Sequence, residues 1–82
     1  MNQATANRVF EAALTATFRR TRLGLAASVT VGGYAYTVEA GGAFLACIDG
    51  RSGRDGHEYA FANATHEQDD ALRAAIAAQG GK

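Results

Sequence analysis

Two glycines, Gly32 and Gly33, constrain the folding of this 82-residue chain more than any other feature. Apolar residues occupy every second position on both sides of the pair, namely Val29, Val31, Tyr34, Tyr36 and Val38. A period of two is that of a β-strand with one buried face. A two-residue Gly-Gly loop favours a type I′ turn, because both central positions need a positive φ. We therefore predict a hairpin over 28–38, with Val31 opposite Tyr34 and Val29 opposite Tyr36.

The segment before this hairpin has the period of a helix. Between about Asn2 and Arg20 the apolar residues return every three or four positions, as Ala6, Val9, Phe10, Ala13, Leu14 and Phe18. Such a stripe predicts an amphipathic helix with one face on the core. Asn2 or Thr5 can cap its first turn. Arg19, Arg20 and Arg22 are then expected at its end, where the helix dipole is negative.

Gly41-Gly42 predicts the next turn, whose length decides which face of the following strand is buried. A two-residue loop would place Leu45, Cys47 and Asp49 on the core side. A three-residue loop that includes Ala43 would instead place Phe44, Ala46 and Ile48 there. Burying the Asp49 carboxylate without a partner is costly. We therefore expect the three-residue loop, with Leu45 and Cys47 on the open face.

The C-terminal half predicts one more strand and a second helix. Residues 49–56 form a glycine-rich loop, and an alternating strand follows over 58–62 with Ala60 and Ala62 on the open face. Thr65 and Gln68 fit a capping box, and Gly80 fits a C-cap. The core-facing residues of this second helix are predicted to be Leu72, Ala75, Ile76 and Gln79. A single domain over 1–82, with a flexible tail at 79–82, is expected.

These elements predict an α+β fold. The expected architecture is a two-layer sandwich in which a four-stranded antiparallel meander sheet carries the N- and C-terminal helices on one face, in the order α-β-β-β-β-α. Nineteen Ala and ten Gly leave only fifteen Leu, Ile, Val and Phe to fill the core. So thin a core favours a homodimer or a complex with another protein. The predicted outer strands, 28–31 and 58–62, carry no Lys or Pro to protect their edges.

The sequence predicts a cytoplasmic protein. Its longest uncharged stretch, 23–38, is interrupted by polar residues and glycines and is shorter than a membrane span needs. The first residues form no basic leader and no apolar export segment. The single Cys47 has no second cysteine to pair with. We therefore expect neither membrane association nor an internal disulfide.

No pattern of residues predicts an enzyme. Cys47 and His57 are a nucleophile and a base, but no nucleophile motif surrounds them, and a lone strand cysteine usually fills apolar space. The spacing of His57 and His66 matches no common zinc site, and the loop aspartates lack the order of an EF-hand. We expect no catalytic residues, no metal and no cofactor, and we keep a small Cys47/His57 enzyme as an alternative.

Charge is balanced overall but unevenly distributed. Eight basic and eight acidic residues give a formal net charge of zero, which excludes a uniformly basic or acidic protein. Arg19, Arg20 and Arg22 form a basic cluster near the first helix, and Glu67, Asp69 and Asp70 form an acidic cluster at the start of the last one. Complementation of the helix dipoles and recognition of a partner both explain these clusters. The glycine-rich loop adds Arg51 and Arg54, either as a solvated tip or as contacts to an acidic partner.

In overall profile the chain resembles the small phage-encoded inhibitors of bacterial immunity, the anti-CRISPR proteins. The resemblance covers the whole chain as one cytoplasmic α+β domain without active-site motifs, and it carries over no functional residue. It implies a non-enzymatic inhibitor that occludes a subunit of a CRISPR effector complex. The residues we expect to contact the partner are Arg19, Arg20, Arg22, Arg51, Arg54 and Leu45. The alternative is direct binding of nucleic acid by the arginines of residues 19–22 and of the glycine-rich loop.

Overall fold

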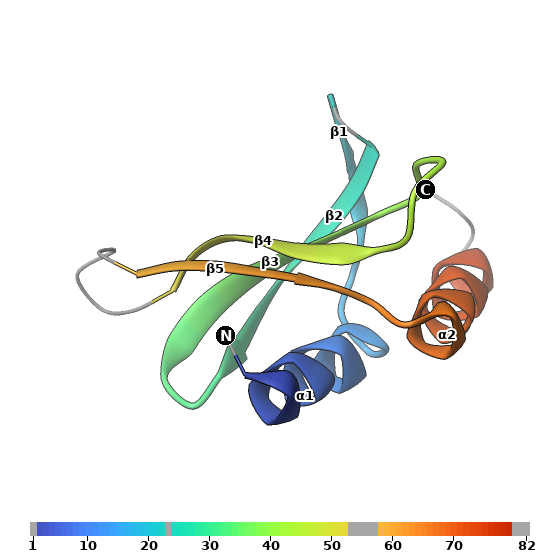
Figure 1. Ribbon diagram of the computed structural model, residues 1–82. Coiled ribbons are helices and arrows are strands. Elements are labelled where there is room, and N and C mark those ends of the chain that lie inside the picture. The colour runs from blue at the N-terminus through green and yellow to red at the C-terminus, as the bar shows by residue number, and fades with distance from the viewer. Residues whose placement is uncertain (1, 23, 53–57, 80–82) are drawn as a thin grey trace.

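The computed structural model describes residues 2–22, 24–52 and 58–79 (Figure 1). Its elements are α1 (Gln3–Ala13), β1 (Arg19–Thr21), β2 (Gly24–Val31), β3 (Tyr34–Ala40), β4 (Cys47–Ser52), β5 (Glu58–Asn63) and α2 (His66–Ala78). The strands form one antiparallel sheet in the order β1-β2-β3-β4-β5. The predicted α+β fold with N- and C-terminal helices is confirmed. The predicted number of strands is wrong, because the sheet has five strands instead of four.

The additional strand is β1, which forms because α1 ends earlier than its apolar stripe suggested. Asn2 caps the helix as predicted, but the helix stops at Ala13, and the chain turns before Arg19 enters β1. Two interactions hold this turn. Phe18 is buried in the core, and the side-chain amide of Gln79 accepts from the Phe18 N–H at 3.2 Å and donates to the Ala16 carbonyl at 2.8 Å. A long-range contact therefore overrides the local helical pattern.

The central hairpin has the predicted register. Val29 pairs with Tyr36 and Val31 with Tyr34. Gly32 and Gly33 have φ of 62° and 84°, the left-handed conformation that a type I′ turn requires. Val29 and Tyr36 are buried, whereas Tyr34, at the end of the hairpin, is 42% exposed.

The connection between β3 and β4 is longer than predicted. Val38 pairs with Ile48 and Glu39 with Cys47, which is a shift of two residues from the expected register. A shift of two preserves the face of each residue, so Ala46 and Ile48 are buried as predicted. The prediction for Phe44 is wrong. This residue lies in the loop before β4, and its side chain is 86% exposed.

The face assigned to β5 is also wrong. Ile48 pairs with Ala62 and Asp49 with Phe61. Because directly paired residues point to the same face, Ala62 packs against the core beside Ile48, while Phe61 lies on the open face and is 52% exposed. The sequence alternation of β5 fits either face, and only its pairing with β4 decides between them.

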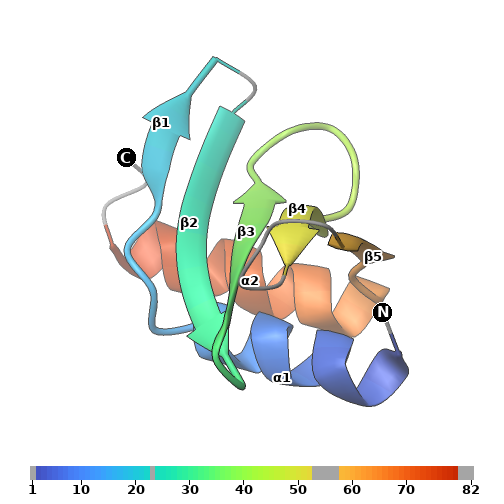
Figure 2. The same ribbon diagram turned by 90° about the vertical axis from the view of Figure 1, so that its left-hand side faces the viewer.

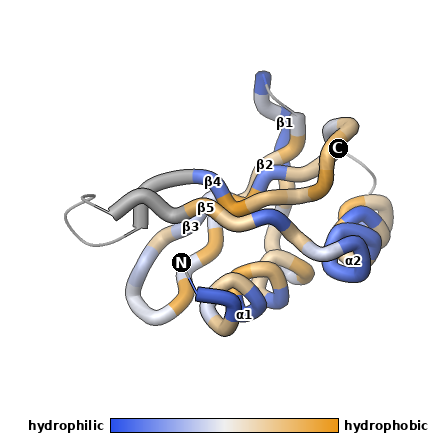
Figure 3. Tube along the Cα trace, viewed as in Figure 1, coloured by the Kyte–Doolittle hydropathy of each residue, from blue (hydrophilic) through white to orange (hydrophobic). Residues whose placement is uncertain are grey.

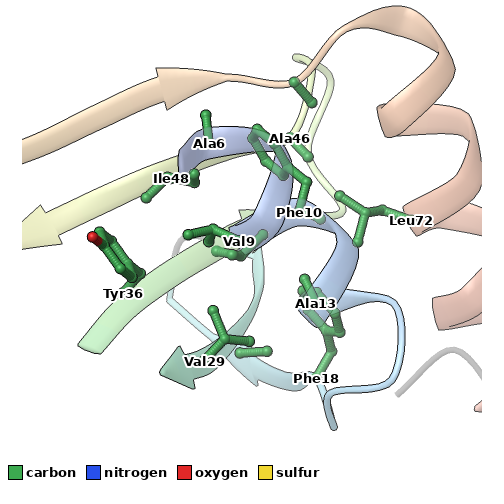
Figure 4. Packing of buried hydrophobic residues seen from close by; sticks show 14 of the residues in the cluster. Ala6, Val9, Phe10, Ala13, Phe18, Val29, Tyr36, Ala46, Ile48 and Leu72 are labelled. Carbon is green, nitrogen blue, oxygen red and sulfur yellow. The ribbon is translucent and has the colours of Figure 1, made fainter. Parts of the chain in front are cut away.

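Both helices cover one face of the sheet, as predicted (Figure 2). Val9, Phe10 and Leu72 from the helices meet Ile48 from the sheet (Figure 4). Val38 belongs to the same cluster, and all five residues are at most 2% exposed. The described core also contains six alanines, namely Ala6, Ala13, Ala27, Ala40, Ala46 and Ala64. A core so rich in alanine brings the layers close together and provides little apolar area for each buried side chain.

The sheet opens between its two long hairpins. β3 and β4 pair only around Val38 and Glu39, and beyond this point the β4–β5 hairpin extends away from the helices (Figure 1). β1 pairs with the first residues of β2, so the outer strands are β1 and β5. The prediction of β5 as an edge is confirmed. The other predicted edge, 28–31, belongs to β2, the second strand of the sheet, but β1 pairs only with Gly24–Ala26 and does not reach 28–31.

We expect Gly33→Ala to destabilise the fold by about 1 kcal/mol, because a Cβ is disfavoured at a positive φ even where space is free. Gly42→Ala is the matched control: Gly42 has no positive φ, and a Cβ there would meet nothing within 4 Å. Urea unfolding of both variants measures the difference. Equal stability of the two variants would contradict the assigned turn.

Candidate interaction surface

The basic cluster predicted from the sequence lies on the edge of the sheet. Arg19 and Arg20 belong to β1, where they pair with Ala26 and Leu25, and Arg22 lies in the turn that follows. All three side chains are exposed. They form no ion pair with any other residue that the structure describes. Since α1 ends at Ala13, these arginines do not complement its dipole.

A groove runs beside β1. It has a volume of about 690 Å³ and is lined by Arg19 and Arg20 together with the hydroxyls of Thr17, Ser28 and Thr37. A neighbouring groove of about 490 Å³ shares Thr37 and adds Arg22 and Glu39. Guanidinium groups and hydroxyls are donors for carboxylates or phosphates. The presence of Glu39 gives the combined surface both signs of charge.

The loop between β3 and β4 is held by a buried polar clamp that the sequence analysis missed. Asp69 of α2 is 5% exposed and accepts the Ala46 N–H at 2.8 Å. Its other carboxylate oxygen accepts from Arg73 Nε at 2.8 Å. The Arg73 guanidinium also donates to the carbonyls of Gly42, at 3.1 Å, and Phe44, at 2.7 Å. One Asp–Arg pair thereby fixes both ends of the loop.

The environment of Asp69 favours its charged form. Burial alone raises the pKa of this carboxyl, but the hydrogen bonds from Arg73 and from the Ala46 N–H, with the charges of Arg73 and His66, outweigh burial and lower the pKa overall. Asp69 was predicted to belong to an acidic surface cluster with Glu67 and Asp70. Asp69 does lie in the first turn of α2, as the dipole interpretation requires, but its burial excludes it from a recognition surface, while the other two side chains are exposed.

The clamp presents Phe44 to solvent. The backbone carbonyl of Phe44 is held by Arg73 while its ring is 86% exposed. The apolar stretch that runs from this loop into β4 is visible in Figure 3. Leu45, the apolar contact predicted from the sequence, is half-buried instead. The loop lies beside the β1–β2 turn, since a Cβ on Gly24 would meet the Gly42 nitrogen at 3.9 Å.

The structure does not describe most of the remaining candidate residues. Arg54 and His57 lie outside the described residues, as does the side chain of Arg51. Burial and the nearby charges of Glu39 and Asp49 raise the pKa of the Cys47 thiol, the reverse of the shift that activates a nucleophilic cysteine. Within the described ranges, no three His, Cys, Asp or Glu side chains are grouped to hold a metal ion.

Across the same ranges, the structure contains no helix long and apolar enough to cross a membrane. Comparisons of the chain with protein-family models, curated proteins and solved structures found no match.

We expect Asp69→Asn to destabilise the fold by about 2 kcal/mol at pH 7, because it removes the charge that Arg73 pairs with. Since the folded-state pKa of Asp69 is lowered, its carboxylate contributes stability above the unfolded pKa of about 3.9 and loses that contribution as the pH falls through the folded value. The stability gap between wild type and variant should therefore narrow below about pH 4.

The exposed neighbour Asp70 provides the control for this prediction. Asp70→Asn should change stability by less than about 0.5 kcal/mol at pH 7. Chemical unfolding of the three proteins between pH 7 and the acid range measures both effects. A gap for Asp69→Asn that stays constant in acid would contradict the role assigned to the carboxylate.

Proposed function

We propose that the protein is a non-enzymatic inhibitor of phage or mobile-element origin that binds a subunit of a CRISPR effector complex and blocks its activity in the bacterial cytoplasm. The observation that carries this proposal is the set of exposed arginines, unpaired with any residue that the structure describes, beside the two grooves on the β1 side of the sheet. Exposed arginines around a concave surface are common contacts in protein interfaces. The overall profile of the sequence, which resembles that of anti-CRISPR proteins, supplies the class of partner.

Charge pattern favours a protein over nucleic acid as the partner. Arg19, Ala26 and Glu39 follow one another across β1, β2 and β3, so a cation and a carboxylate flank one small residue. Asp49 lies on the same face, on β4. A phosphate backbone presents negative charge throughout and would be repelled by these carboxylates. A protein surface can offer both signs of charge and match the pattern.

Binding should therefore depend on Arg19. We expect Arg19→Glu to weaken binding to the purified target complex by tenfold or more and to restore interference in a plasmid assay, because it places a third carboxylate near Glu39 and Asp49. Arg8→Glu is the control, since Arg8 is exposed on α1 and its substitution changes the net charge by the same amount. Calorimetric titration measures the affinities.

The outcome of this experiment separates several cases. Equal weakening by the two variants would indicate a dependence on net charge rather than this surface. If the wild-type protein binds no effector complex and leaves interference unchanged, the anti-CRISPR form of the proposal is wrong.

Direct nucleic-acid binding is the second candidate, because arginines and hydroxyls in the larger groove also suit phosphate. Titration with duplex and single-stranded DNA tests it. A nucleic-acid binder should bind at low salt and lose affinity steeply as salt increases, by a slope that reflects the number of phosphates contacted. Absence of binding at low salt would exclude this candidate.

A further inference from the structure

An apolar groove lies between the two helices. It has a volume of about 350 Å³ and is lined by Asn7, Phe10, Glu11, Leu14, Gln68 and Ala71. Phe10 forms its buried floor, while Leu14 is half-buried and Ala71 is exposed. Its volume lies at the lower end of the range of ligand pockets, about 300–1,000 Å³, and leaves room for one aromatic side chain.

One side-chain hydrogen bond joins the two helices beside the groove, and a second bond within α1 supports it. Gln68 Nε2 donates to Asn7 Oδ1 at 2.8 Å, and Gln3 Nε2 donates to the same oxygen at 2.8 Å. The Gln68–Asn7 bond links α1 and α2 at one end of the groove. The groove is therefore formed before any ligand arrives, which lowers the entropy lost on binding.

Phe44 is an exposed aromatic side chain on the same molecule, of the kind that this groove has room for. Its ring is 86% exposed, and Arg73 holds its carbonyl, so the backbone that carries the ring is positioned before binding. Arg73 is partly exposed beside Phe44, and Glu11 stands at the rim of the groove without an ion pair to any described residue. Arg73 Nε is paired with Asp69, but its Nη1 makes no hydrogen bond to any described residue and can donate to a carboxylate such as Glu11 of a second copy.

The placement of these two features on α2 permits a closed dimer. Gln68 and Ala71 face the groove, whereas Asp69 and Arg73 face the β3–β4 loop, so the first turns of α2 separate the ring from the groove. A two-fold axis beside these turns would bring each ring to the groove of the other copy. We propose that two copies of this chain form a dimer in which Phe44 of each copy occupies the α1–α2 groove of its partner.

This inference concerns self-association and is independent of the effector binding proposed above. Sedimentation of the purified protein from about 1 μM to 1 mM tests it without any effector. The mass should rise from 8.5 kDa towards twice that value and then remain constant. A monomer throughout the range would overturn the proposal. A mass that continues to rise past the dimer would overturn its closed form.

Two variants locate the contact. We expect Phe44→Ala and Ala71→Arg each to weaken dimerisation by about a hundredfold, because a two-fold dimer contains each change twice and a tenfold loss per site multiplies. Phe61→Ala and Ala35→Arg are the matched controls, since both residues are exposed on the open face of the sheet, away from the helices. Both controls should dimerise like the wild type.

Mixing the two variants shows whether they weaken dimerisation by removing the contact between Phe44 and the groove or by unfolding the protein. Phe44→Ala keeps an intact groove and Ala71→Arg keeps an intact ring, so a mixture of the two restores one of the two contacts. We expect the mixture to form more dimer than either variant alone at the same total concentration. If the mixture does not exceed the separate variants, Phe44 and the groove do not meet, and the proposal is wrong.

Discussion

The hydrogen bond from the Ala46 N–H to the buried Asp69 carboxylate determines where β4 begins. The carbonyl of Ala46 accepts from the Ala64 N–H at 2.7 Å, so both backbone groups of Ala46 are used outside the β3–β4 ladder. That ladder consequently starts at Cys47, and the residues before it form a loop with Phe44 outside the core. The same register places Ile48 opposite Ala62 on the buried face, which leaves Phe61 in solvent. One side chain of α2 thus helps to set where β4 begins and leaves Phe44 in the loop before it.

Local signals in the sequence were sufficient where the interaction is local. The Gly32-Gly33 turn and the Thr65–Gln68 capping box need only neighbouring residues, and both are present. The end of α1 and the start of β4 could not be predicted in this way, because Gln79 and Asp69 fix them from positions far along the chain. A signal for the clamp was nevertheless present. Asp69 and Arg73 are four residues apart and share a helix face with Leu72 and Ile76, a spacing that suits a buried ion pair.

The sequence predicted which arginines form the candidate site but not the element on which they lie. Arg19, Arg20 and Arg22 were expected at a helix end, where the dipole would have explained them. On a three-residue edge strand, the physical alternative to recognition is protection of the edge, because short charged edge strands resist pairing with other chains. Edge protection requires charge alone. It does not account for the adjoining grooves, in which Arg19 and Glu39 occupy neighbouring strands around Ala26, and this arrangement favours a partner with complementary charges.

The two proposed surfaces lie on different sides of the molecule. The β1 grooves include residues of the open sheet face, whereas the groove between α1 and α2 belongs to the helical layer that covers the opposite face (Figure 2). A dimer formed through the helices would therefore leave both open faces accessible. Two identical surfaces joined in this way bind a target that presents two copies of one site more tightly than a single surface does, because the second contact becomes intramolecular. Self-association would then increase the potency of inhibition against a repetitive target without adding any contact to the individual binding surface.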